Sequence, residues 1–299
     1  MHDDQVELTV EVVAALVGAQ FPQWAGEPVR ALASTGTVNA IFRIGDGLSA
    51  RFPLRRVGAD EALVVLEREA RASAELAGVS PVPVPEPVAL GRPGAGYPMP
   101  WSVQTWVPGR VALEEDPSGS DAFAEDLAGF VAALRTADTR GRVFDGDNRG
   151  GVLTDHDAWM ARCFEESEGL LDVPRLRQIW SGLRELPRTA PDVMSHGDLI
   201  PGNVLVAGGR LGGVLDTGGF GAADPALDLV GAWHLLRAGP RQAFRRALGC
   251  DELEWERGKA WAFEQAMGLV WYYAESNPPM SELGRRTLTR ILNATTPRP

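Results

Sequence analysis

Two carboxylates and a carboxamide lie close together in the sequence, next to short apolar runs, and their types suit phosphoryl transfer. Asp198 and Asn203 belong to S-H-G-D-L-I-P-G-N, and Asp216 follows in V-L-D-T-G. Moving a γ-phosphoryl group requires an acceptor hydroxyl in line with the leaving group, and Mg²⁺ to neutralise the phosphate charge. Mg²⁺ prefers oxygen ligands. We therefore expect Asp198 to orient and deprotonate the hydroxyl, and Asn203 and Asp216 to hold Mg²⁺.

The residues between Asn203 and Asp216 predict a β-hairpin. They form two apolar runs that meet at Gly208-Gly209. A glycine pair between apolar strands is a hairpin turn signal. Such a hairpin would return Asp216 to the neighbourhood of Asn203.

A second group of short strands is predicted upstream, at residues 29–32, 38–44 and 48–53, with glycine-containing turns between them. A strand, a glycine turn and a strand can fold backbone amides over a polyphosphate. Ser34 and Gly36 lie in the first of these turns and are candidate phosphate contacts. Residues 60–77 are rich in Ala, Leu and Glu and predict a long helix that ends at Gly78.

The bulk properties describe an ordinary globular protein. The chain has 299 residues, enough for two lobes, and a formal net charge of −11 that argues against nucleic-acid binding and favours a cationic partner. Cys163 and Cys250 have no disulfide or metal spacing. No apolar run is long enough to span a membrane, and the first residues are acidic where a signal peptide is basic. We expect a cytoplasmic protein, monomeric or dimeric.

The polar motifs together resemble the signature of the aminoglycoside phosphotransferase family, small-molecule kinases with a protein-kinase-like fold. The matching residues are His196-Gly197-Asp198 with Asn203, then Asp216-Thr217-Gly218, Asp224-Pro225 and Asp228-Leu229. The resemblance implies a bilobal α+β fold, with a small N-terminal lobe of antiparallel sheet plus helix and a larger, mostly helical C-terminal lobe. It places the nucleotide-binding lobe at residues 1–107, the hinge at 104–109, and the catalytic and acceptor-binding lobe at 110–299.

The resemblance also assigns residues to the nucleotide, which would be ATP or GTP. Arg51 occupies the strand position where the family usually has the lysine that binds the α- and β-phosphates, and Arg keeps the charge. Glu67 and Glu69 are both candidates to hold Arg51, and the family pattern favours Glu69. Backbone groups from Thr105 to Val107 would read the adenine edge at the hinge.

Some motif residues are expected to be structural. Asp228 is predicted to hydrogen-bond backbone near the catalytic loop, because buried carboxylates usually do so. His196 is expected to brace the same loop rather than to transfer protons. Asp224-Pro225 is predicted to begin a helix, with proline at its first position.

The sequence predicts the type of reaction more clearly than it predicts the acceptor molecule. The C-terminal helices carry acids that would suit a polycationic aminosugar, and aromatic residues that would suit an apolar acceptor such as a macrolide. These residues are Asp251, Glu252, Glu254, Glu256, Glu264 and Glu275, with Trp255, Trp261, Trp271, Tyr272 and Tyr273. We expect an antibiotic of the aminoglycoside or macrolide type. A kinase of a small metabolite, such as an amino alcohol, a sugar or homoserine, is an alternative, and a nucleotide-binding pseudokinase is another.

Overall fold

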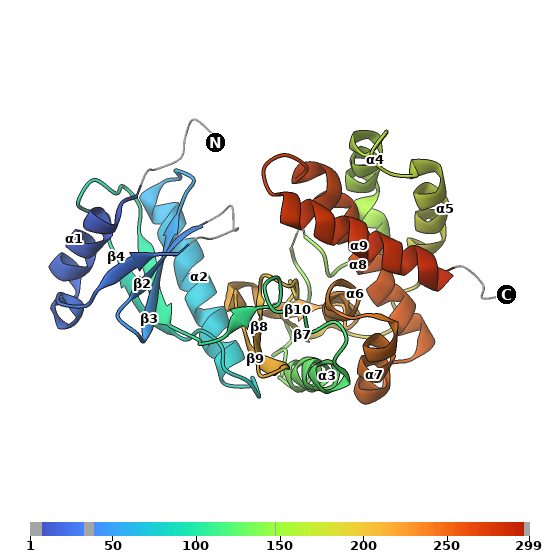
Figure 1. Cartoon of the computed structure of the whole chain (residues 1–299), viewed down its shortest axis with the longest axis horizontal. Helices are drawn as coiled ribbons and strands as arrows, with labels where there is room; N and C mark the ends of the chain where they lie inside the picture. The colour runs from blue at the N-terminus through green and yellow to red at the C-terminus, as the bar shows by residue number, and fades with distance from the viewer. Residues whose placement is uncertain (1–7, 33–38, 147, 296–299) are drawn as a thin grey trace. The chain divides into compact units, whose positions relative to one another are not determined.

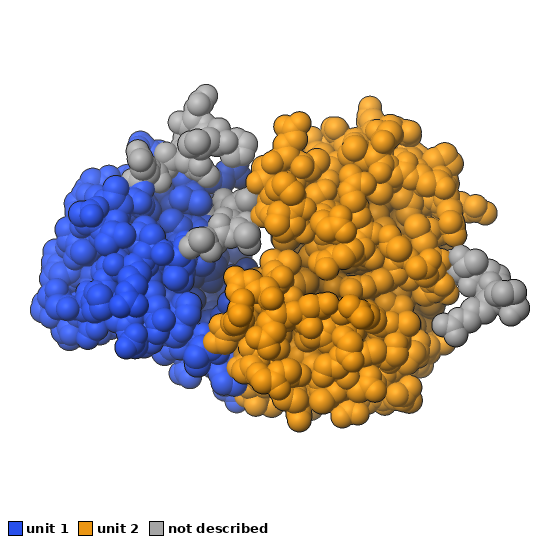
Figure 2. Space-filling view, viewed as in Figure 1, with its two compact units in different colours: residues 1–78, 83–108, 214–219 blue, residues 79–82, 109–213, 220–299 orange. Residues whose placement is uncertain are grey.

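The structure is a computed structural model that describes residues 8–32, 39–146 and 148–295. The chain divides into two compact units (Figure 2). The first unit comprises residues 1–78, 83–108 and 214–219, and the second comprises 79–82, 109–213 and 220–299. The short segment that contains Asp216 therefore belongs to the first unit, although it follows the strands of the second in sequence.

The first unit is built on a five-stranded antiparallel sheet in the order β1-β2-β3-β5-β4. Figure 1 labels β2, β3 and β4 of this sheet. The strands are β1 (Val29–Ala31), β2 (Asn39–Ile44), β3 (Leu48–Pro53), β4 (Pro87–Gly91) and β5 (Trp101–Thr105). In the register of the sheet, Arg51 of β3 lies opposite Ser102 of β5. This strand pairing places the predicted phosphate-binding cation in the middle of the sheet.

Helix α1 (Val10–Gln20), followed by the 3₁₀ turn η1 (Pro22–Trp24), packs against one face of this sheet. Val13, Leu16 and Val17 of α1 form an apolar core with Ala50 and Phe52 of β3 and their neighbours. Successive side chains of a strand point to opposite faces. Arg51 therefore faces away from the α1 core, toward α2 (Ala59–Ala77).

The second unit is mostly helical and is organised around α8 (Glu252–Tyr272) (Figure 1). This helix is buried along most of its length by its neighbours. The other helices are α3 (Asp121–Arg135), α4 (Asp157–Glu166), α5 (Val173–Leu183), α6 (Val230–Leu235), α7 (Ala238–Leu248) and α9 (Pro278–Thr295). The buried residues of α8 include the polar side chains Arg257, Glu264 and Gln265.

Two small sheets of the second unit flank the loop that carries Asp198. One joins β6 (Arg110–Val111), β8 (Val204–Ala207) and β9 (Arg210–Val214), and the other pairs β7 (Val193–Ser195) with β10 (Gly221–Ala223). The turn from β8 to β9 is Gly208-Gly209, with φ angles of 60° and 76°. The predicted hairpin is confirmed, and its two glycines supply the positive φ values that such a turn requires.

One predicted helix start is displaced. Asp224-Pro225 begins a turn rather than a helix, because the Asp224 carbonyl accepts from Leu227 N–H and its side chain accepts from Ala226 N–H. The 3₁₀ turn η4 (Leu227–Leu229) follows, and α6 begins only at Val230. The remaining 3₁₀ turns are η2 (Leu153–His156) and η3 (Thr217–Gly219). Among the described helices, none is long and apolar enough to cross a lipid bilayer.

Candidate active site

Asp198 lies in the loop between β7 and β8, where other side chains of the second unit hold it. The amide of Asn203 donates from Nδ2 to the Asp198 carbonyl and to its Oδ2, both at 3.0 Å. The other carboxylate oxygen, Oδ1, accepts from Gln265 Nε2 at 2.7 Å and lies 3.4 Å from Arg149 Nη2. A carboxylate has about four lone-pair sites. These contacts therefore orient Asp198 and leave acceptor capacity for a substrate hydroxyl.

The backbone of this loop is anchored by Asp228, which is buried. Its two carboxylate oxygens accept from the backbone N–H groups of His196 and Gly197, each at 2.8 Å. Hydrogen bonds to a charged acceptor are stronger than neutral ones. The predicted structural role of Asp228 is confirmed. His196 accepts from the Asp198 N–H through Nδ1 at 3.3 Å, a contact within the loop that matches its predicted bracing role.

Gln265 and Arg149 were missed by sequence reasoning. Gln265 lies on α8 and is 6% exposed, and Arg149 lies in the polar segment that precedes η2. Arg149 also approaches Glu264, at 3.8 Å from Nη1 to Oε2, and Glu264 contacts His156 at 3.0 Å. No local pattern in the sequence points to these residues, since both are far from Asp198 in sequence and reach it only in the folded chain.

A second buried carboxylate fixes α8 against the chain that follows β10. Asp224 Oδ2 accepts from Arg257 Nε at 3.0 Å and from Trp261 Nε1 at 2.9 Å. Asp224 and Arg257 are both almost fully buried. Removing one partner of such a pair leaves an uncompensated buried charge and is strongly destabilising. The pair therefore holds α8, and with it Gln265, in position.

Asp216 and Arg51 form an ion pair within the first unit. Arg51 Nη2 lies 2.8 Å from Asp216 Oδ1, and the Asp216 side chain is 49% exposed. Asp216 also has a positive φ of 57°, which is uncommon for a residue other than glycine. Left-handed backbone at such residues tends to occur at functional sites.

Of the two glutamates considered for Arg51, only Glu69 faces this region. Glu67 is exposed and approaches Arg71 one turn further along α2, at 3.9 Å. Burial raises the pKa of Glu69, the positive charge of Arg51 opposes that rise, and the negative charge of Asp216 adds to it. Glu69 thus lies within the electrostatic reach of Arg51, while the ion pair that Arg51 makes is with Asp216.

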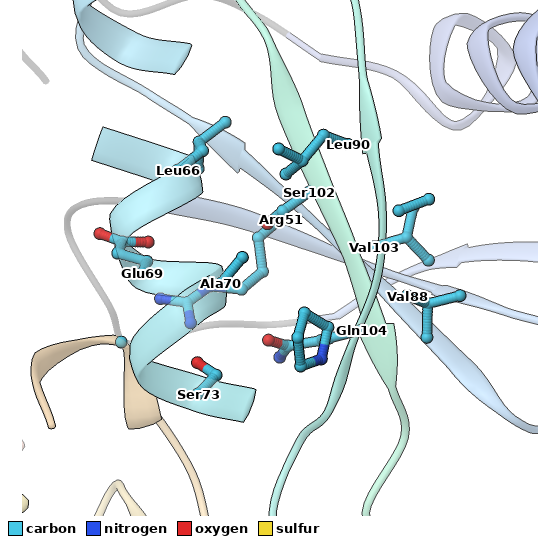
Figure 3. Close-up of a pocket in the computed structure, with 13 residues that line it drawn as sticks. Arg51, Leu66, Glu69, Ala70, Ser73, Val88, Leu90, Ser102, Val103 and Gln104 are labelled. Atoms are coloured by element: carbon cyan, nitrogen blue, oxygen red, sulfur yellow. The ribbon is translucent and has the colours of Figure 1, made fainter. Parts of the chain in front are cut away.

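A cavity of about 210 Å³ lies between α2 and the sheet of the first unit (Figure 3). Figure 3 shows Arg51 reaching from β3 toward α2, which carries Glu69 and Ser73. The far wall consists of residues from β4 and β5, including Leu90 and Gln104. Thr217 Oγ1 hydrogen-bonds to Ser73 Oγ at 2.8 Å, which fixes η3 to α2 beside the cavity.

In the stretch predicted to read the adenine edge, Thr105 to Val107, some backbone groups already have hydrogen-bond partners within the chain. The Thr105 N–H donates to the Glu86 carbonyl at 2.9 Å, and the Trp106 N–H donates to the Gly47 carbonyl at 2.8 Å. Among the described residues, the backbone of Val107 has no hydrogen-bond partner. Val107 thus offers backbone groups to a ligand, and Thr105 offers at most its carbonyl. Ser34 and Gly36 lie outside the described residues.

The residues predicted to hold Mg²⁺ have suitable donor atoms. Because Asn203 directs Nδ2 to Asp198, its amide oxygen is the atom left for a metal. Asp216 Oδ1 pairs with Arg51 and leaves Oδ2 as a second hard oxygen donor. In the described part of the chain, no three His, Cys, Asp or Glu side chains form a metal cluster by themselves. Each of these two side chains therefore offers an oxygen of the kind that Mg²⁺ prefers.

The acidic residues of the C-terminal helices are largely engaged within the chain. Glu252 pairs with Arg245, Glu254 with Arg135, and Glu256 with Lys259. Glu264 contacts His156, and Asp251 caps the N-terminus of α8. Glu275 is exposed. Most of the acids that could attract a polycation are therefore already neutralised by internal partners.

Comparison with known proteins gives the family of the chain. Residues 29–261 match the model of the phosphotransferase enzyme family. An aminoglycoside 3'-phosphotransferase of Streptomyces fradiae is 35% identical over 163 residues, which cover 50% of this chain and 57% of the relative. One from Escherichia coli is 29% identical over 143 residues, which cover 46% and 52%. The chain thus spans only about half the length of the curated relatives that it matches.

Solved structures share the fold over nearly the whole chain. The GDP and kanamycin complex of APH(2")-IIIa matches with a TM-score of 0.69 and 20% identity, covering 95% of this chain and 99% of the other. The macrolide 2'-phosphotransferase of Brachybacterium faecium matches with a TM-score of 0.63 and 18% identity, covering 96% and 100%. The predicted α+β, protein-kinase-like fold is confirmed. With the family model matching most of its length, the chain belongs to the phosphotransferase enzyme family.

Proposed function

We propose that this protein transfers the γ-phosphoryl group of ATP or GTP to a hydroxyl of a small molecule of the aminoglycoside or macrolide antibiotic type. The observation that carries the proposal is the orientation of Asp198, whose carboxylate is held by Asn203 and Gln265. Family membership supports the reaction class. We further propose that it acts in the cytoplasm, as a monomer or dimer.

In this mechanism Asp198 accepts a hydrogen bond from the acceptor hydroxyl and turns its oxygen toward the γ-phosphorus. A loose transition state requires little early base catalysis, so the proton moves to Asp198 late in the transfer. The anchoring of the loop by Asp228 keeps the carboxylate from turning away during the reaction. Preorganised geometry of this kind lowers the entropic part of the barrier.

The donor is assigned to the first lobe, residues 1–107, and the acceptor to residues 110–299. Arg51 would bind the α- and β-phosphates with Glu69 behind it, Ser34 and Gly36 would contribute backbone amides, and Thr105 and Val107 would meet the adenine or guanine edge. Mg²⁺, held by Asn203 and Asp216, would neutralise charge on the phosphate oxygens. In such a complex Arg51 would bind the nucleotide phosphates and Asp216 would bind the metal, in place of the ion pair that they form with each other.

For the acceptor, the relatives support antibiotics. One solved relative is a complex with kanamycin, and another is a macrolide 2'-phosphotransferase. A small metabolite is the second candidate, and the internal pairing of the acids on α8 favours it. A polycation would have to compete with Arg135 and Arg245 for the same carboxylates.

An acceptor panel tests this proposal. Purified protein is incubated with Mg²⁺ and either ATP or GTP, and with kanamycin, streptomycin, erythromycin, homoserine, ethanolamine or glucose. Phosphorylated product is detected by mass spectrometry. We expect turnover of at least one of the antibiotics. Turnover of a metabolite with every antibiotic inert would move the assignment to the second candidate, and nucleotide binding without any transfer would support a pseudokinase.

Replacing Asp198 with Asn tests the role of this carboxylate. General acid–base catalysis contributes about 10²- to 10⁴-fold to a rate, so we expect kcat to fall by that order. The dissociation constant of the nucleotide should change less than about threefold, because Asp198 is assigned to the acceptor. The exposed Asp145, replaced by Asn, is the matched control. Equal kcat for Asp198→Asn and wild type would remove Asp198 from its assigned role.

A further inference from the structure

A chain of buried side chains runs from the last helix of the second unit to Asp198. It consists of Thr287 on α9, His234 on α6, and Gln265 on α8. Their exposed fractions are 0%, 1% and 6%. Three helices thus meet the catalytic loop through a single line of hydrogen bonds.

The acceptor oxygen of Asp198 determines which group donates and which accepts in each hydrogen bond of this line. Asp198 Oδ1 is an acceptor, so the Gln265 amide must turn Nε2 toward it, at 2.7 Å. Gln265 Oε1 is then left facing His234 Nε2, at 3.0 Å, and can only accept. His234 must therefore carry its proton on Nε2.

The far end of the line is consistent with this arrangement. Burial lowers the pKa of His234 to about 3, so the ring is neutral near pH 7 and has one N–H. With the proton on Nε2, Nδ1 is an acceptor, and the Thr287 hydroxyl lies 2.9 Å from it as the donor. Every polar atom in the line then has a partner of the correct kind, from Thr287 to Asp198.

We propose that Gln265 is a positioning residue for Asp198, and that His234 and Thr287 fix the direction of its amide. Without this line Gln265 Oε1 would lack a donor, and the amide would be free to leave Asp198 Oδ1. The proposal rests on the proposed function in so far as Asp198 is the residue that orients the acceptor. Its geometric content does not depend on which acceptor is used.

Other groups also face Asp198 and must be distinguished from this line. Asn203 binds the opposite carboxylate oxygen, Oδ2, and Arg149 lies at the longer distance of 3.4 Å from Oδ1. Arg149 also forms an ion pair with Glu264, at 3.8 Å. Gln265 makes the shortest of these contacts, and it is the one whose own orientation is determined by buried partners.

The first test replaces Gln265 with Met, which has similar length and no amide. We expect kcat to fall about 10- to 100-fold with the acceptor that turns over among kanamycin, streptomycin and erythromycin. KM for that acceptor and for the nucleotide should stay within about threefold of wild type. The matched control is Gln178→Met, at an exposed position on α5. A kcat unchanged in Gln265→Met, or a loss confined to KM, would overturn the proposal.

The second test asks whether the three residues act as one unit. Thr287→Val keeps the shape of the side chain and removes the hydroxyl donor. We expect a smaller fall in kcat than in Gln265→Met, and no further fall when Thr287→Val is added to Gln265→Met. Independent effects would instead multiply in the double variant. A multiplicative result would overturn the proposed line.

Crystal structures of wild type and Gln265→Met provide a readout that needs no activity. We expect the Asp198 carboxylate to leave its single orientation in the variant while the backbone of residues 195–203 stays in place. An unchanged Asp198 side chain would overturn the positioning role. If wild type phosphorylated no acceptor, the proposed function would fail, while this comparison would still decide whether Gln265 orients Asp198.

Discussion

Arg51, which we propose binds the nucleotide phosphates, forms an ion pair with Asp216 in the structure. Their ion pair is partly exposed, and exposed pairs contribute only about 0–1 kcal/mol to folding stability. Such a weak pair can be exchanged for stronger contacts without destabilising the lobe. Arg also presents a planar fork that suits phosphate oxygens. The replacement of the family's usual lysine by Arg51 is therefore compatible with nucleotide binding.

Replacing Arg51 with Gln should separate binding from stability. Hydrogen bonds to charged groups are worth about 1.5–3 kcal/mol, so we expect the nucleotide dissociation constant to rise roughly 10- to 100-fold. The free energy of unfolding should change by less than about 1 kcal/mol. Calorimetric titration with ATP and GTP and urea denaturation measure the two quantities. Arg30→Gln, at an exposed position on strand β1, is the control and should leave nucleotide affinity unchanged.

Among the elements of the site, those that depend on neighbouring residues or on a fixed motif could be predicted from the sequence. Gly208-Gly209 predicted the hairpin because only particular residues adopt its backbone angles. The motif around Asp198 predicted the loop, and the acidic residue at Asp228 predicted its anchor. These features depend on residues close together in sequence or on a motif with fixed spacing.

The contributions of α8 and its neighbours were not predictable in the same way. Gln265 lies in a helix that is buried on nearly all sides, so no polar face distinguishes its position. Arg149 lies in a segment without periodic pattern. The displaced start of α6 has a similar cause, since Asp224 and Pro225 suit either a helix start or a turn. In each case tertiary packing decides among locally equal alternatives.

The packing of α8 against α9 leads to a prediction about Gly284. A Cβ at this position would lie 2.7 Å from the Ala266 carbonyl oxygen and 2.8 Å from Val270 Cγ2. Gly-to-Ala in a helix interior normally gains up to about 1 kcal/mol, but overpacking costs about 1–3 kcal/mol. We expect Gly284→Ala to lower the free energy of unfolding by about 1–2 kcal/mol, measured by urea denaturation.

A matched control for that experiment exists on α3. Gly129 is exposed in the middle of its helix, and a Cβ there would meet no atom within 4 Å. Gly129→Ala should therefore raise the free energy of unfolding by about 0.5–1 kcal/mol, as helix propensity alone predicts. Stabilisation by both substitutions would mean that α8 and α9 are not closely packed at Gly284.

The whole molecule carries a net negative charge, yet many of its carboxylates form ion pairs within the chain. The net charge of −11 suggested a cationic partner. Many carboxylates are nevertheless engaged, as Asp224 is with Arg257 and Glu254 with Arg135. Net charge describes the long-range field, whereas recognition depends on carboxylates that remain available. The acceptor must therefore be decided by direct assay.

The free energy of unfolding should depend on pH in part because of His234. Burial lowers the pKa of this ring from 6.5 to about 3 in the folded protein. Between these values the unfolded chain binds a proton at this position and the folded protein does not. The free energy of unfolding therefore has its full contribution from His234 above pH 6.5, and loses it as the pH falls toward 3. The slope from one such group is at most about 1.4 kcal/mol per pH unit.

Urea denaturation of wild type and His234→Gln at pH 7, 6, 5 and 4 isolates this contribution. Most other titrating groups are common to the two proteins, so their effects largely cancel in the difference between the curves. His234→Gln should be less stable than wild type at pH 7, because it disturbs the contacts with Gln265 and Thr287. The deficit should shrink as the pH falls, since only wild type loses the His234 contribution. Parallel stability curves from pH 7 to pH 4 would show that the ring is already accessible to protons in the folded protein.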